Sequence, residues 1–275
     1  SHCSSLRFPS PSPRSPTSLA STAYPALSAA GNLWAWTTQL HVDHRIALPS
    51  DSTLVIQWGV LDPLTGEVPA HEYNRVATAG ERTGIPAQAI RVGWQRGAEE
   101  RPVAVGVGAY HAHQDWGLGR TVHSWAATTD WNVALGRRFA LSGEVYRGSA
   151  LGGLGGGASE SVLFGGPSTA STSAVQAVDS VGGWSQLKFT PAPRIEFNAA
   201  FGEDHPFRTS LRRFLTMGRG DASAVNQNAS AFLNAIYQAR SNLLFSLEYR
   251  RLWTTSLDDI RRTADHISFS TGIGF

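Results

Sequence analysis

Cysteine is nearly absent from this sequence, since Cys3 is the only one among 275 residues. A lone cysteine excludes an internal disulfide framework, a CxxC redox pair and a zinc site built on cysteine ligands. Charged residues are also scarce, at 16% of the chain, against roughly 25% in typical soluble domains. The formal net charge of +2 is too small to indicate a nucleic-acid partner.

Long apolar runs are missing as well. No stretch approaches the roughly 18 to 20 consecutive apolar residues that a membrane-spanning helix needs. Methionine occurs only as Met217 and the chain opens at Ser1, so we expect a processed or truncated product. Residues 1–31 are rich in serine and proline, which predicts a disordered segment ahead of one folded domain over residues 32–275.

Glycine (28 residues) and tryptophan (9 residues) are plentiful, a mix that favours short strands with many turns. From Asn32 onward, apolar and polar residues alternate with a period of two, which places one set on each face of a β-strand. For example, Ile195 and Phe197 alternate with Glu196 and Asn198. The pattern predicts about eleven strands, around residues 34–42, 54–60, 90–95, 103–108, 124–133, 141–146, 186–189, 195–202, 233–238, 243–250 and 267–275.

The connections between these runs alternate in length. Short turns are predicted at 49–52, 97–102, 136–138, 191–194 and 239–242, and longer links at 62–88, 112–120, 150–178, 204–228 and 255–264. Short turns at one rim and long loops at the other are typical of outer-membrane barrels, whose strands need only about 10 residues with alternate apolar side chains.

We therefore predict an all-β fold, a transmembrane antiparallel up-and-down β-barrel in the bacterial outer membrane, rather than a soluble all-β domain. The predicted count of eleven strands is odd, whereas bacterial single-chain barrels close on even numbers. Either N-terminal strands are missing from this chain, or a further strand lies within 62–88 or 155–178.

The C-terminal segment HISFSTGIGF (266–275) alternates apolar and polar residues up to the final phenylalanine. It resembles the signal through which outer-membrane barrels are recognised by the barrel assembly machinery. That resemblance assigns the signal to Phe269, Ile273 and Phe275. The alternative is an ordinary amphipathic strand that happens to end in phenylalanine.

Three segments resemble the DcaP-like porins of Gram-negative bacteria: VIQWGVLDPLTGEV (55–68), LSGEVYRGSALGGLGGG (141–157) and VDSVGGWSQLKFTPAPRIEFNAAFGEDHP (178–206). The likeness extends over roughly residues 54–275 and is loose outside the last segment. It implies a trimeric, many-stranded channel for small organic acids. Residues 1–31 match nothing in that family, and the resemblance implies that this chain is an N-terminally incomplete member.

If the apolar faces of the strands meet lipid, their polar faces surround a water-filled lumen. The charged residues of those polar faces are the predicted pore lining: Asp43, Arg45, Arg91, Asp130, Glu144, Lys188, Glu196, Glu248 and Arg250. Charges of both signs on a lumen wall would filter solutes by size and charge. The alternative, which is compatible with the first, is that these residues pair with one another to hold the wall.

The link around 204–221 carries arginines without an intervening acid: Arg208, Arg212, Arg213 and Arg219. Arginine binds carboxylates in a two-pronged manner, so this loop would favour anions if it folds inward. The alternative is a solvated loop that binds lipopolysaccharide phosphates or nothing.

Sites for metals and catalysis have little support in the sequence. His111 and His113 fall on one strand face, but no third ligand is adjacent in the sequence. No GxSxG or HExxH motif is present, and the glycines of 152–157 do not form a nucleotide-binding pattern.

We therefore predict a channel for passive diffusion of small hydrophilic solutes, leaning toward organic anions, with no cofactor and no catalytic residue. Two alternatives remain. One is a barrel enzyme of lipase or protease type, with an active site at the extracellular rim drawn from His71, His113, His123 and His205. The other is a structural or adhesive barrel with a plugged lumen.

Overall fold

The computed structural model describes residues 16–20, 26–34, 37–67, 76–97, 103–215 and 224–273, without the side chains of 213–215. The strands are β1 (Gln39–Leu48), β2 (Ser52–Leu61), β3 (Ala87–Arg96), β4 (Val103–Asp115), β5 (Thr121–Leu135), β6 (Phe139–Ser149), β7 (Val162–Phe164), β8 (Val175–Ala177), β9 (Asp179–Ala192), β10 (Ile195–Pro206), β11 (Val225–Arg240), β12 (Leu243–Ser256) and β13 (Arg261–Ile273). The helices are α1 (Arg208–Leu215) and the single 3-10 turns η1 (Glu81–Thr83), η2 (Gly152–Leu154) and η3 (Gly157–Ser159).

Eleven strands form one antiparallel sheet in the order β1-β2-β3-β4-β5-β6-β9-β10-β11-β12-β13. Each strand pairs with its neighbour along the chain, apart from the short hairpin β7–β8, which forms a separate sheet between β6 and β9. The prediction of about eleven hairpin-connected strands is confirmed. The hairpin lies within 155–178, one of the two places where a further strand is expected, but it does not join the main sheet.

Several predicted boundaries were wrong. The first strand begins at Gln39 rather than near Trp34, whose backbone N–H instead donates to the carbonyl of Leu154 at 2.9 Å. Two links expected to be long are short, 116–120 and 257–260, because the flanking strands extend further than their alternation indicated. The long connections on that rim are 62–86, 150–178 and 207–224.

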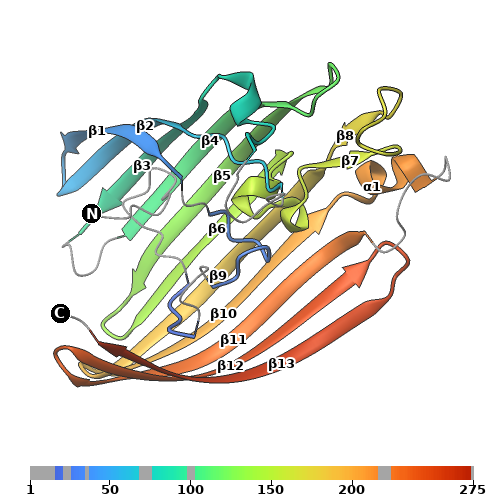
Figure 1. The fold of residues 1–275 in the computed structure, drawn as a ribbon. Coiled ribbons are helices and arrows are strands. Elements are labelled where there is room, and N and C mark those ends of the chain that lie inside the picture. Colours follow the sequence, from blue (N-terminus) through green and yellow to red (C-terminus); the bar gives the residue numbers. More distant parts are fainter. Residues whose placement is uncertain are drawn as a thin grey trace.

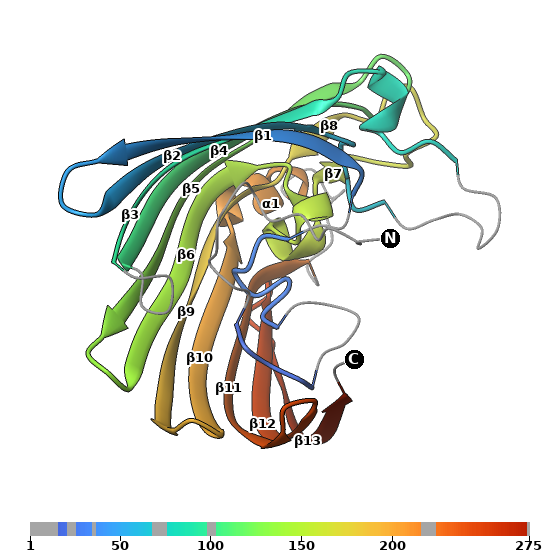
Figure 2. The same ribbon diagram turned by 90° about the vertical axis from the view of Figure 1, so that its left-hand side faces the viewer.

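The sheet curves into an open trough, and the 150–178 connection folds over its concave side (Figures 1 and 2). The arginine-rich link is not a loop throughout, because it contains helix α1. Leu211 anchors the helix, because it is buried with Val178 and Leu257. In the part of the chain that the structure describes, β1 and β13 each have one neighbouring strand, so both edges of the sheet are open.

The buried apolar residues lie on the concave side rather than between two layers. One cluster joins Leu61, Tyr110 and Tyr146 of the sheet to Leu151 and Leu154 of the 150–178 connection. No helix among the described residues is long and apolar enough to cross a membrane. The domain boundary predicted at residue 31 stays a prediction, and residues 1–15 lie outside the described part.

Candidate functional site

The two faces of the sheet have an inverted distribution of polarity. On the convex face, large apolar side chains are open to the surroundings, including Leu40 (73% exposed), Leu233 (60%) and Ile267 (79%). On the concave face, charged side chains are covered, with Arg91 and Glu248 each only 2% exposed. A soluble sheet does the opposite, because burying apolar surface is its main source of stability.

Aromatic rings on the convex face gather toward both ends of the strands, and Tyr249 lies between them opposite Leu233. Near the short turns, ring pairs are Phe139–Phe189, Phe189–Phe197 and Phe245–Phe269, with centroids 4.6, 6.3 and 6.2 Å apart. Toward the loop ends lie Trp125 and the pair Phe201–Trp253. Two aromatic girdles flanking an aliphatic band are what the two lipid–water interfaces select in membrane barrels.

The concave face is organised around a buried ion pair. Arg91 of β3 reaches across β4 to Asp130 of β5, and its Nε and Nη2 donate to the two carboxylate oxygens at 2.7 Å each. Nη1 of Arg91 also donates to Gln57 at 3.4 Å, and the amide of Gln57 donates to Asp43 at 3.0 Å. A chain of polar side chains from four strands therefore runs from β1 to β5, across β4.

Glycines on β3 and β4 create the space for the Arg91 guanidinium. A Cβ atom at Gly106 would lie 2.2 Å from Nη2 of Arg91, and one at Gly93 would lie 2.4 Å from Nη1. Both distances are far below van der Waals contact, so any larger residue would displace the guanidinium. Gly106 also stands directly opposite Asp130 in the β4–β5 register, which leaves the path between the charges clear.

A second carboxyl group faces the pair. Glu144 of β6 stands opposite Asp130 in the register and is 8% exposed. Its Oε1 atom is buried and has no hydrogen-bond partner among the described residues. The concave face is called the wall below. Its β3–β6 part therefore combines one guanidinium with two carboxyl groups.

The β9–β12 part of the wall carries a ladder of amides. Gln186 donates to Asn198 at 2.9 Å, Asn198 donates to Asn234 at 2.9 Å, and Asn234 donates to Glu248 at 3.1 Å. The Glu248 carboxylate also accepts from Nε and Nη2 of Arg250 at 3.0 and 2.7 Å. Each residue is held by its neighbour on the next strand, so this part of the wall is pre-organised.

The remaining predicted wall residues are less covered. Lys188 pairs with Glu196 at 3.0 Å, and the two side chains are 24% and 25% exposed. Asp43 and Arg45 lie on the edge strand β1 and are exposed. The structure thus brings the predicted wall residues onto one face in two groups, and many of their charges pair with each other.

An N-terminal segment lies against the amide ladder. The N–H of Thr17 donates to the side-chain oxygen of Gln186 at 2.6 Å, and the amide of Asn234 donates to the Thr17 carbonyl at 2.7 Å. The Ser18 hydroxyl donates to Glu248. Residues 16–20 therefore occupy part of the concave space (Figure 2).

Residues 26–34 also lie against the concave face, and they pack there through apolar side chains. Leu27 and Ala30 are buried with Trp184 of β9 and Phe232 of β11. A Cβ atom at Gly202 of β10 would lie 2.2 Å from the Ala30 carbonyl oxygen. The glycine therefore permits the segment to touch the backbone of the wall, and the interior is partly filled.

The arginines predicted to attract anions are placed at the loop rim, apart from the wall. Arg208 forms an ion pair with Asp259 in the β12–β13 connection, which ties α1 to that rim. Arg212 is exposed on α1. Arg213 belongs to the same helix but its side chain is outside the described part, and Arg219 lies outside the described residues altogether.

The predicted insertion signal falls on the edge strand β13. Phe269 and Ile273 point to the convex face and are 70% and 67% exposed. Phe275 lies outside the described residues. The alternation that motivated the prediction is therefore present on β13, and the role of these residues stays a prediction.

Sequence reasoning missed the neutral members of the wall. Gln57, Gln186, Asn198 and Asn234 share the inward parity of the charged residues and connect them, so counting every polar inward position would have found them. It also missed the third member of a histidine group. His111, His113 and His123 gather on the convex face. Among the described residues, these three place ligand atoms close enough together to hold a metal ion.

Comparisons with known proteins identify the fold. No protein-family model matches the sequence, and no curated protein matches it. Among solved structures, the chain is similar to the outer membrane channel DcaP of Acinetobacter baumannii, with a TM-score of 0.64 and 11% sequence identity. The match covers 95% of this chain and 69% of that chain. The predicted all-β antiparallel fold and its likeness to the DcaP-like porins are thereby confirmed, and the matched structure is a channel.

Proposed function

We propose that this chain forms the wall of a porin-type channel in the bacterial outer membrane, through which small hydrophilic solutes diffuse passively. The observation that carries the proposal is the inversion of the sheet: Leu233 is 60% exposed on the convex face, while Arg91 and Glu248 are 2% exposed on the concave face. Lipid on the convex side would cover the apolar side chains, and water on the concave side would solvate the remaining charges.

Closure of the wall requires more strands than this sheet contains. Within the described residues, β1 and β13 have open edges, and an unpaired backbone group costs several kcal/mol in hydrocarbon. An eleven-stranded sheet is also odd, whereas single-chain barrels are even. We infer that additional strands pair with both edges in the membrane, and that three such barrels assemble as a homo-trimer.

The lining proposed for the channel is the paired wall. Arg91 with Asp130, Lys188 with Glu196 and Arg250 with Glu248 set positive and negative groups side by side. Such a lining places local dipoles along the wall, and this favours dipolar and ionic solutes over apolar ones of similar size. The preference for organic anions rests on the rim arginines.

Lipopolysaccharide would surround the loop rim, and the barrel assembly machinery would act on β13.

A specific observation favours a second candidate, a plugged barrel. Leu27 is 2% exposed and packs on the inner wall. In a plugged barrel, residues 16–20 and 26–34 block conduction instead of narrowing the lumen. Planar-bilayer recording separates the two candidates. For a channel, the closed barrel that includes the additional strands gives discrete conductance steps, and the same barrel shortened by the residues before Thr37 gives larger ones. Steps from the shortened chain alone would indicate a plug, and no steps from either folded, inserted protein would contradict a channel.

A charge-removal experiment tests the anion preference. Combining Arg208→Ser, Arg212→Ser and Arg213→Ser is expected to lower the anion-to-cation permeability ratio several-fold. The attraction between one arginine and a monovalent anion is worth about 1 kcal/mol at 4 Å in water, and more in a narrow pore. Salt screens part of this attraction. Reversal potentials in a salt gradient measure the ratio.

The matched control for this triple variant removes charge from the opposite rim. Arg137→Ser with Arg138→Ser acts in the exposed β5–β6 turn and is expected to change the ratio less. Because Arg208 is already paired with Asp259, most of the effect should come from the other two positions. An unchanged reversal potential in the triple variant would place the arginines outside the conduction path.

A further inference from the structure

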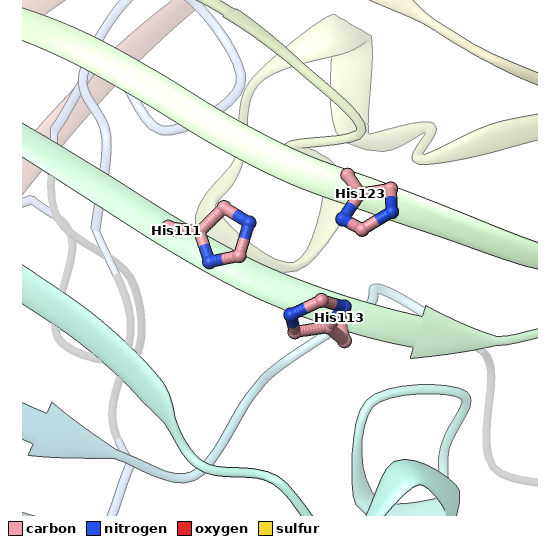
Figure 3. A group of neighbouring side chains, drawn as sticks. All are labelled: His111, His113 and His123. Atoms are coloured by element: carbon pink, nitrogen blue, oxygen red, sulfur yellow. The ribbon is translucent and has the colours of Figure 1, made fainter.

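Three histidines from two strands meet on the convex face of the sheet. His111 and His113 lie two residues apart on β4, and His123 of β5 stands directly opposite His113 in the register. The ring centroids are 4.8 Å apart for His111 and His113, 4.7 Å for His113 and His123, and 5.9 Å for His111 and His123. Figure 3 shows the three rings gathered on the neighbouring strands.

The backbone register makes this arrangement a rigid one. Residues at i and i+2 of a strand point to the same face, and directly opposite residues of an antiparallel pair have Cβ atoms about 4.5–5.5 Å apart. Both relations apply here, so two strands with a short connection at 116–120 present three imidazoles without help from a long loop. One candidate ligand atom from each histidine lies within 4.8 Å of the others.

The location gives the group access to water. His123 is the next outward residue beyond Trp125 toward the loop rim, and Trp125 belongs to the loop-side aromatic girdle described above. His111 and His123 are exposed and His113 is half-buried. If the convex face meets lipid as proposed above, the imidazoles lie at the lipid–water boundary and outside the hydrocarbon, so a hydrated ion can reach them.

We propose that His111, His113 and His123 bind a divalent late transition-metal ion of the zinc class, with water in the fourth position. Zinc takes imidazole nitrogens at about 2.0–2.1 Å in a tetrahedral arrangement, which sets two such nitrogens closer together than 4.8 Å. Rotation about the broad χ2 angle of histidine supplies the difference. Neutral imidazole suits zinc, copper and nickel, whereas magnesium and calcium prefer oxygen ligands.

Metal binding at this position would cross-link β4 and β5 next to the loop rim. Because the ligands come from two strands, the ion would stabilise the hairpin and raise the melting temperature of the folded protein. The site does not depend on a conducting lumen, since it lies on the convex face. Its test is therefore separate from that of the proposed channel.

Titration calorimetry with ZnCl₂ on the full chain folded in detergent micelles tests the site. We expect one zinc ion per chain for the wild type. His123→Ala removes the ligand from β5 and should weaken binding by at least about tenfold, since even outer-shell changes cost 10–100-fold. The matched control is His205→Ala, because His205 is also a histidine of the convex face but stands 3.8 Å from Glu203 and away from the group.

Two further measurements keep the result independent of folding. Cobalt(II) should give the intense visible bands of four-coordinate geometry with the wild type and His205→Ala, and lose them with His123→Ala and His111→Asn. Titration with MgCl₂ should give no heat of binding, because imidazoles do not take magnesium. Heat with MgCl₂ would come from lipopolysaccharide phosphates carried over with the protein. Equal zinc affinity in wild type and His123→Ala, with both proteins folded, would overturn the proposal, as would octahedral cobalt spectra in the wild type.

Discussion

Replacing Arg91 with methionine is expected to destabilise the folded protein by about 3–5 kcal/mol, because it leaves buried acids without their cation. Arg91 and Asp130 have side-chain exposures of 3% and 6%. Glu144 stands opposite Asp130 on the next strand. Methionine matches much of the length of the arginine side chain but cannot neutralise or hydrogen-bond either carboxyl group, so the two acids would face each other across the β5–β6 register.

The same substitution at Lys188 provides the matched control. Lys188→Met also breaks one ion pair of the concave wall, but its partner Glu196 is 25% exposed and water can solvate it. Exposed pairs contribute about 0–1 kcal/mol, so a loss in that range is expected. Equilibrium unfolding by urea in micelles measures both variants.

A double variant distinguishes lost charge balance from lost packing. Arg91→Met combined with Asp130→Asn removes one uncompensated carboxylate and should recover a substantial part of the loss, because the large cost arises from an unpaired buried charge. Equal losses for Arg91→Met and Lys188→Met would mean that lumen water already solvates Asp130. No recovery in the double variant would assign the loss to packing.

The face of each side chain was predictable from the sequence, whereas the pairings were not. Alternation alone places Arg91 and Asp130 on one face, because parity along a strand does not depend on its neighbours. Their contact depends on the registers of β3, β4 and β5 and on the absence of side chains at Gly93 and Gly106. Alternation carries no information about register, so only the common face could be predicted.

The histidine group illustrates how an error at one turn propagates through a hairpin. The link predicted at 112–120 would end β4 before His113, and the pairing of His113 with His123 is then not expected. In the structure the turn runs through Gly117, Leu118 and Gly119, all with positive φ, and the strands continue to residue 115 and from residue 121. Because register is fixed by the turn, centring it on Leu118 sets His113 opposite His123.

The packing of residues 16–20 and 26–34 against the concave face could not have been predicted from the sequence pattern. Residues 16–34 are rich in serine, alanine and proline and have no period of two, so nothing in their order marks a partner. Several of their contacts are made through backbone groups, such as the Thr17 carbonyl that accepts from Asn234. Backbone contacts leave no signature in side-chain type.

Whether lipid covers the convex face can be decided at Leu233. This residue lies midway along β11 between the two aromatic girdles and is 60% exposed. Arginine near the midplane on the lipid face of a barrel costs about 2–4 kcal/mol. In a water-soluble sheet, the same exposed position would tolerate arginine within about 0.5 kcal/mol. For folding into lipid vesicles, followed by guanidinium titration, Leu233→Arg is therefore expected to lose about 2–4 kcal/mol.

Leu118→Arg is the matched control, since Leu118 is 58% exposed but lies in the β4–β5 connection at the loop rim. The cost of a cation on the lipid face falls to about 0–1 kcal/mol near the interfaces, so this variant should fold with nearly wild-type stability. A depth-dependent difference between two leucines of equal exposure arises only if the surrounding medium changes along the strand. If both variants lose less than about 0.5 kcal/mol in vesicles, the convex face meets water, and the proposed channel would fail together with its lipid-facing wall.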